Sequence, residues 1–181
     1  MTIDQLKLET EATLAVATAA IGEGIFTPII RAFRDGAWKT VAVPGHVFSD
    51  GETKDRLWRG LRDIVERCQI EAIIIVSDVS VWTATNKAAA VGIPALEKLR
   101  NEHDIDWLAE HGYVQHQERF MALAQTVEVA GMISQLYRRR PDGIALIEET
   151  EPWSVKPQDE LDGRTKMFGA LPSPSVWHTQ K

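Results

Sequence analysis

The stretch Glu71–Ala84, EAIIIVSDVSVWTA, decides the fold class, because it is typical of a strand that is buried on both faces. Its apolar run Ala72–Val76 is mostly β-branched. Side chains alternate along a strand, so Asp78 shares a face with Val76 and Trp82. A carboxylate in such surroundings needs a hydrogen-bond or cationic partner, or it takes up a proton. Asp78 therefore either bonds local backbone or solvent where the strand leaves the core, or it is a functional group.

The residues before this strand predict a helix and a hairpin. Thr2 and Gln5 have the spacing of a capping box, and the alanine-rich segment up to Ile21 favours a helix. Two β-prone runs, Ile25–Arg34 and Ala37–Val43, are then separated by Asp35-Gly36. This dipeptide tolerates the left-handed conformation and is typical of a type I′ hairpin turn.

A second helix is expected directly before the central strand. Ser49 and Glu52 repeat the capping-box spacing. Behind them, apolar residues recur at helical spacing from Leu57 to Cys68, with charged residues on the other side. The pattern predicts an amphipathic helix over residues 50–68.

The part of the chain after the central strand shows no clear strand pattern up to residue 140. Pro94 is expected at the start of one helix, and Asp104–His111 reads as another, ending at Gly112. Residues Gln115–Arg139 predict a longer helix. Strands are expected again over Gly143–Thr150 and Arg164–Leu171.

Together these elements predict an α+β fold, with about five mainly antiparallel strands flanked by helices and a helical segment between the third and fourth strands. We expect one domain over residues 1–171, with the helical elaboration at about 85–140. Residues 172–181 are expected to form an extended C-terminal tail, since PSPSVWHTQK is rich in proline.

Composition restricts the class of protein. The chain has 181 residues, a formal net charge of −6 and 25% charged residues, which is ordinary for a globular protein and gives no overall attraction for nucleic acid or anionic lipid. Cys68 is the single cysteine, which suits a reducing compartment. No secretory signal or membrane-spanning run is evident, so we expect a cytoplasmic location and no membrane contact.

The first half of the chain, with its order helix, hairpin, helix, strand, resembles the beginning of profilin-like and roadblock-like domains. That resemblance implies an antiparallel sheet used as a binding or regulatory platform. The chain also resembles small uncharacterised bacterial and phage-related proteins in two places. One is Ile73–Trp82, and the other is Arg140-Pro141-Asp142 before Ile144–Ile147. This second resemblance implies no activity.

Candidate chemistry is concentrated between His103 and His116, where Asp104, Asp106 and His111 also lie. No pair has the HExxH spacing, so we expect solvated helix ends and no metal ion or cofactor. The catalytic candidates are Asp78, His103 and His111. Cys68 ends an apolar helix stripe and reads as an inert buried thiol.

Binding is the function class that the sequence favours. Ligand or interface candidates are Asp78, Ser80, Trp82 and Gly131. The block Ala88–Arg140 carries more apolar surface than a short α+β core needs, and Ala124, Ala130 and Gly131 are small, so we expect a homodimer that packs through the Gln115–Arg139 helix. We therefore expect a binding or regulatory protein that acts on a protein or a small ligand. One alternative is a metal-dependent hydrolase that uses Asp78 and the His103–His116 segment. Another is a nucleic-acid-associated protein that uses Arg138–Arg140, although these cations also suit a helix C-terminus.

Overall fold

We describe the fold from a computed structural model, which places residues 1–19, 28–44, 51–141, 145–158 and 167. In this part of the chain six strands form one antiparallel sheet with the order β2-β1-β3-β4-β5-β6. The predicted α+β class is confirmed, with six strands in place of about five. The strands are β1 (Ile29–Arg34), β2 (Ala37–Ala42), β3 (Ala72–Ala84), β4 (Val114–Thr126), β5 (Val129–Arg139) and β6 (Ala145–Pro157). The helices are α1 (Ile3–Ala19), α2 (Gly51–Arg67), α3 (Asn86–Val91), α4 (Ile93–Glu102) and α5 (Ile105–Glu110).

The predicted hairpin is confirmed. Asp35 and Gly36 connect β1 to β2 with φ angles of 51° and 76°, the pair of positive values that a type I′ turn requires. Phe33 and Trp38 lie opposite each other across the turn, with their ring centroids 5.3 Å apart.

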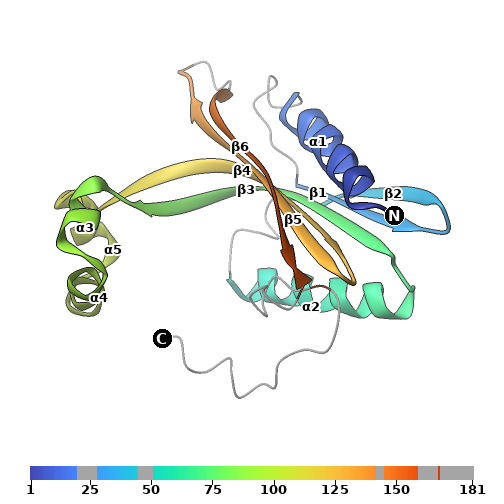
Figure 1. Ribbon diagram of the computed structural model, residues 1–181, viewed down its shortest axis with the longest axis horizontal. Coiled ribbons are helices and arrows are strands. Elements are labelled where there is room, and N and C mark those ends of the chain that lie inside the picture. Colours follow the sequence, from blue (N-terminus) through green and yellow to red (C-terminus); the bar gives the residue numbers. More distant parts are fainter. Residues whose placement is uncertain (20–27, 45–50, 142–144, 159–166, 168–181) are drawn as a thin grey trace.

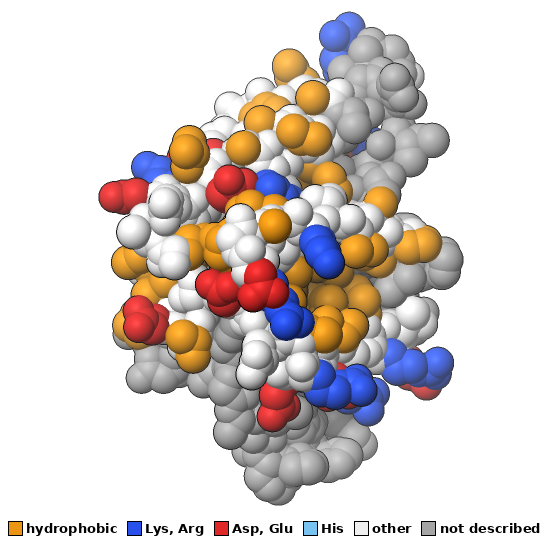
Figure 2. Space-filling view, turned by 90° about the vertical axis from the view of Figure 1, so that its right-hand side faces the viewer, with side chains coloured by type: hydrophobic (Ala, Val, Ile, Leu, Met, Phe, Trp, Pro, Cys, Tyr) orange, Lys and Arg blue, Asp and Glu red, His pale blue; other side chains and the backbone are white. Residues whose placement is uncertain are grey.

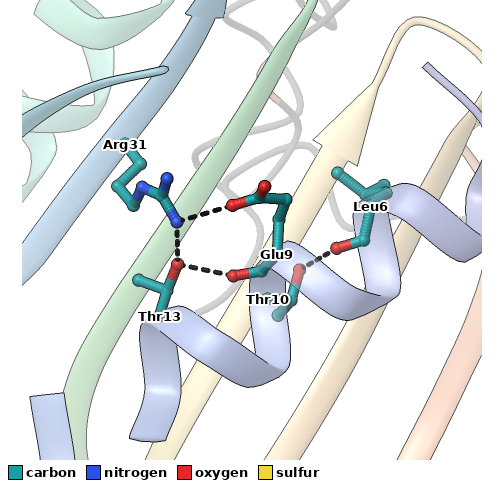
Figure 3. A network of polar contacts seen from close by, with 5 residues as sticks. All are labelled: Leu6, Glu9, Thr10, Thr13 and Arg31. Carbon is teal, nitrogen blue, oxygen red and sulfur yellow. Dashed lines mark hydrogen bonds and ion pairs between the residues drawn. The ribbon is translucent and has the colours of Figure 1, made fainter. Parts of the chain in front are cut away.

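Helix α1 begins at the predicted capping box, in which Gln5 N donates to Thr2 Oγ1 at 3.2 Å and Thr2 N donates to Gln5 Oε1 at 2.9 Å. Arg31 of β1 binds the middle of this helix (Figure 3). The Arg31 guanidinium donates to Glu9 Oε2 at 2.9 Å and to Thr13 Oγ1 at 2.7 Å. These polar contacts fix the position of α1 along the sheet.

The two faces of the sheet carry separate cores. Figure 1 shows α1 and α2 on opposite sides of the strands. Even-numbered β3 residues such as Ile74 and Val76 pack in a cluster with Leu6 and Leu14 of α1. The odd-numbered Ile73 and Ile75 pack with Leu61 and Val65 of α2 on the other face. The alternation expected for a doubly covered strand is thus present in β3.

The predicted helix over Gln115–Arg139 is wrong, because this segment forms β4 and β5. Only Val127 and Glu128 connect the two strands, and the Thr126 hydroxyl accepts from the backbone N–H of Glu128 at 3.2 Å. The segment is rich in Ala, Leu, Met, Gln and Glu, which favour helices in isolation. Pairing with a β-branched central strand overrides that local preference. The helical elaboration is therefore shorter than expected and ends with α5.

Strands β3 and β4 extend beyond the rest of the sheet (Figure 1). They pair with each other as far as Ala84 and Val114, whereas β1 stops opposite Val76 and β5 stops opposite Glu118. We call this two-stranded extension the arm. The residues between its strands, 85–113, contain α3, α4 and α5 and are called the tip. The predicted helix starting near Pro94 and the predicted Asp104–His111 helix are confirmed as α4 and α5.

The expected strand over Arg164–Leu171 lies outside the described residues apart from Met167, as do Ser49 of the second capping box and the tail 172–181. Met167 is buried, and its N–H donates to Oε1 of the buried Gln125 at 2.9 Å.

Within the described residues, none of the helices combines the length and the apolar content that crossing a bilayer would require. Figure 2 shows the side remote from the tip, where hydrophobic side chains lie between charges of both signs.

Candidate functional site

Asp78 lies in a polar cluster where the arm meets the sheet. Its Oδ1 accepts a hydrogen bond from the Tyr137 hydroxyl at 2.8 Å, and its Oδ2 lies 3.4 Å from Arg139 Nη2. Arg139 Nε is also 3.7 Å from Glu118 Oε2. We call these four residues, from three neighbouring strands, the polar cluster. Asp78 thus has the hydrogen-bond and cationic partners that its place in the strand demands.

Tyr137 is the buried member of the polar cluster. Its ring stacks on Phe120 with a centroid separation of 4.0 Å, and the residue is almost fully removed from solvent. Burial, followed by the hydrogen bond to Asp78 and the charge of that carboxylate, raises the pKa of the Tyr137 phenol above its ordinary value. The phenol is therefore a neutral hydrogen-bond donor to Asp78 near neutral pH.

Removal of this hydroxyl should have a pH-dependent effect. Below about pH 10, Tyr137→Phe should lower the free energy of unfolding by about 1 kcal/mol, since a partly exposed carboxylate loses one hydrogen bond. Because the folded-state pKa is raised, the unfolded chain ionises first as pH rises above about 10, and the wild-type advantage declines there. Denaturant titrations near neutral pH and above pH 10 measure the difference. A gap between the two proteins that widens with rising pH would contradict this assignment.

Ser80 and Trp82, two of the predicted interface residues, lie on the same strand face as Asp78 and farther along the arm. Both side chains are exposed, and the Trp82 ring packs on His116 of β4 with a centroid separation of 5.1 Å. Strand alternation thus brings three of the predicted residues to one face of the arm.

The histidines named as catalytic candidates lie elsewhere, in the tip. His103 and His111 both stack on the indole of Trp107, with ring centroids 3.7 Å and 3.8 Å from that of the indole. In addition, His111 Nδ1 contacts the Trp107 carbonyl oxygen at 2.9 Å. Asp104 caps α5 by accepting from Trp107 N at 2.8 Å. The described residues contain no group of three or more His, Cys, Asp or Glu side chains arranged to hold a metal ion.

Asp78 and these histidines do not meet. Asp78 and Ala84 are six residue steps apart along an extended strand, a span of about 20 Å, and the tip begins only beyond that point. The residues assigned to an acid, a base or metal ligands therefore belong to different parts of the molecule.

The arginine run also differs from expectation, because Arg138 and Arg139 lie in β5 and not at a helix C-terminus. Strand alternation directs them to opposite faces of the sheet. Arg138 pairs with Glu148 at 3.0 Å, whereas Arg139 belongs to the polar cluster. The two side chains do not form one basic surface.

Gly131 is not at a helix interface, which corrects the role expected for it. It lies in β5, where the Trp153 ring covers it. A Cβ atom added at Gly131 would overlap the indole carbons of Trp153. Glycine is needed here so that an aromatic side chain can pack directly on the backbone of the strand.

One exposed apolar segment of the tip was not singled out as a binding candidate from the sequence. Residues Ala89–Ala95, AAVGIPA, connect α3 to α4, and all of them except Gly92 are exposed. Gly92 has φ 81° and ψ 161°, a backbone conformation that is nearly restricted to glycine. We call this segment the apolar corner. The sequence signal for this segment was a run of seven uncharged residues that includes Gly92 and Pro94. Such a run is also typical of an ordinary break between two helices.

Comparison of the chain with protein-family models, with curated proteins and with solved structures gives no match.

Proposed function

We propose that this protein works by binding another protein, with the sheet as a rigid base, the arm as a spacer and the apolar corner of the tip as the contact surface. One observation carries the proposal: α4 has no buried residue, and its first residue, the large apolar Ile93, is 73% exposed. An amphipathic helix normally buries its apolar side chains in its own protein.

The tip has too few buried side chains to account for its apolar content. Ala88 of α3 and Leu108 of α5 are buried, together with Val114 at the start of β4. Val91, Ile93 and Ile105 remain exposed. Units of fewer than about 40 residues usually need a disulfide, a metal or association with another surface to be stable. Association is the route that suits exposed aliphatic side chains.

The charges around the apolar corner indicate a protein partner. The tip carries Lys87, Lys98 and Arg100, and also Glu97, Glu102, Asp104, Asp106 and Glu110. Lys98 and Glu102 lie 3.8 Å apart, and Lys87 Nζ donates to the His111 carbonyl oxygen at 2.8 Å. A membrane-binding or nucleic-acid-binding surface would carry an excess of cations. An apolar patch with a mixed polar rim is typical of a protein interface.

The other functions expected from the sequence receive less support from the geometry. A hydrolase would need Asp78 and the tip histidines within reach of one substrate, and the arm separates them. Nucleic-acid binding through Arg138–Arg140 would need a shared basic surface, but Arg138 and Arg139 are engaged with acids on opposite faces.

The test uses one substitution in the apolar corner. Ile93→Lys should weaken partner binding at least about tenfold. The substitution removes an apolar anchor side chain and places an unpaired ammonium group in an apolar interface. A partner is first captured from an extract of the source cells with the wild-type protein. Its affinity for purified wild-type and variant proteins is then measured by calorimetry.

The matched control is Val127→Lys in the β4–β5 turn, where the replaced side chain is 68% exposed. Both variants should keep wild-type stability within about 0.5 kcal/mol, because they alter exposed positions. Equal affinity of the Ile93 variant and the wild type would refute the proposal. Loss of binding in both variants would place the contact outside the tip.

A further inference from the structure

In the described part of the chain, one edge of the central strand has no neighbouring strand along the arm. Among the described residues, β1 lies beside β3 only as far as the pair Ile29 and Val76. Strand β3 continues to Ala84, and on that side the described part of the chain places no strand next to it. We call Ser77–Ala84 the arm edge.

The backbone groups that face outward along the arm edge follow from the hydrogen-bond pattern. Thr85 N donates to Tyr113 O at 3.0 Å, so Thr85 directs its backbone groups toward β4. Because this direction alternates along an antiparallel strand, odd-numbered residues of the arm edge bond β4. Asp78, Ser80, Trp82 and Ala84 therefore direct their N–H and C=O groups away from β4, toward the arm edge.

The arm edge lacks the features that protect other exposed strands. Such strands commonly carry lysine, proline or a bulge, which prevent another chain from pairing with them. The sequence SDVSVWTA has none of these residues, and β3 pairs with β4 in one continuous register. Its one charge, Asp78, is held by Tyr137 and Arg139, and Trp82 is 42% exposed. The arm edge is thus a suitable template for pairing with another strand.

We infer that two copies of this chain pair antiparallel through the arm edge, so that the sheet continues across a twofold axis. Antiparallel pairing of identical edges places the outward donors and acceptors of one copy against those of the other. A twofold axis perpendicular to the sheet keeps Trp82 of both copies on one face. No uncompensated charge meets its own copy, and a second copy is present in every solution of the protein. This contact differs from the apolar corner and is independent of the function proposed for it.

The experiment measures mass by light scattering on a size-exclusion column at micromolar concentration. Wild-type protein should have twice the chain mass of 20.2 kDa. Ser80→Pro removes an N–H that faces the arm edge and leaves the hydrogen bonds to β4 in place, so this variant should elute as a monomer.

Thr40→Pro is the matched control. Val43 N donates to Pro28 O at 2.8 Å, so by the same alternation the N–H of the exposed Thr40 faces outward from β2, the other side of the sheet. This variant should remain a dimer. A second variant, Trp82→Glu, alters no backbone group and adds one carboxylate to the edge of each copy. It should raise the dimer dissociation constant at least about tenfold, since like charges close together across paired strands repel each other. This variant tests the inference if Ser80→Pro does not fold.

Three results would overturn the inference. One is a wild-type mass of 20.2 kDa. Another is an unchanged dissociation constant in Trp82→Glu. The third is a dimer lost in Thr40→Pro or in Ile93→Lys, which would move the contact to β2 or to the tip. Because Ile93→Lys should leave the dimer intact, failure of the arm edge and failure of the apolar corner give different results.

Discussion

Replacement of Ile75 by alanine is expected to lower the free energy of unfolding by about 2 to 5 kcal/mol, the usual cost of removing a large aliphatic side chain from a core. Ile75 is 2% exposed and packs in the cluster that joins β3 to α2. Its strand is held on both sides, opposite Ile30 of β1 and Leu123 of β4. The surrounding backbone therefore has little freedom to close over the cavity.

Urea titration of wild type, Ile75→Ala and the control Val41→Ala measures this effect. Val41 lies in β2 and is exposed, so its truncation should change stability by less than about 0.5 kcal/mol. Similar midpoints for Ile75→Ala and Val41→Ala would show that β3 is not the packed centre of the sheet.

A methyl group at Gly131 should be nearly as damaging. Gly131→Ala is expected to cost about 3 kcal/mol, because the new Cβ would overlap the Trp153 ring and force that side chain off the sheet. Trp153 packs against the cluster beneath α1, so its displacement also removes apolar contacts.

Two further variants separate this steric effect from a general effect of alanine. Gly60 lies in α2, where an added Cβ meets nothing within 4 Å, so Gly60→Ala should stabilise the protein by up to about 1 kcal/mol. In the background Trp153→Ala, the substitution Gly131→Ala should cost much less than it does alone. Additive losses in the double variant would rule out a direct clash. Thermal unfolding by circular dichroism provides the readout.

The parts of the fold that the sequence predicted well have strong local signals. Asp35-Gly36 has few conformational alternatives to a tight turn, and the β-branched run Ala72–Val76 has few alternatives to a buried strand. The amphipathic pattern of α2 is similarly clear. At these places local preference and tertiary structure agree.

Strands β4 and β5 could not be predicted in this way. Phe120, Leu123, Val127 and Ala130 recur at helical spacing, although in the folded strand β4 buried and partly buried side chains alternate from Phe120 to Ala124. Their turn at Val127-Glu128 contains no Gly, Asn or Asp, so the usual sequence signal of a hairpin is missing. The alternative pairing is visible only once β3 is present beside β4.

The candidate site shows the same division. The alternation of β3 correctly grouped Asp78, Ser80 and Trp82, and the physical requirement for a partner at Asp78 was sound. The identity of that partner was hidden, because Tyr137 and Arg139 lie in the segment that reads as a helix. Likewise, His103 and His111 were predicted to be either solvated helix ends or candidates for catalysis, whereas their rings pack on Trp107.

The way the tip joins the arm makes it an exchangeable unit. Ala84 and Val114, the last paired residues of the arm, lie directly opposite each other, and directly opposed residues in antiparallel strands have Cα atoms about 4.5 to 5.5 Å apart. A two-residue turn spans that gap as well as the whole tip does. Insertions and deletions between these two positions would leave the pairing of the sheet unchanged. The tip can therefore diverge, or be replaced by another sequence, while the scaffold that carries it stays the same.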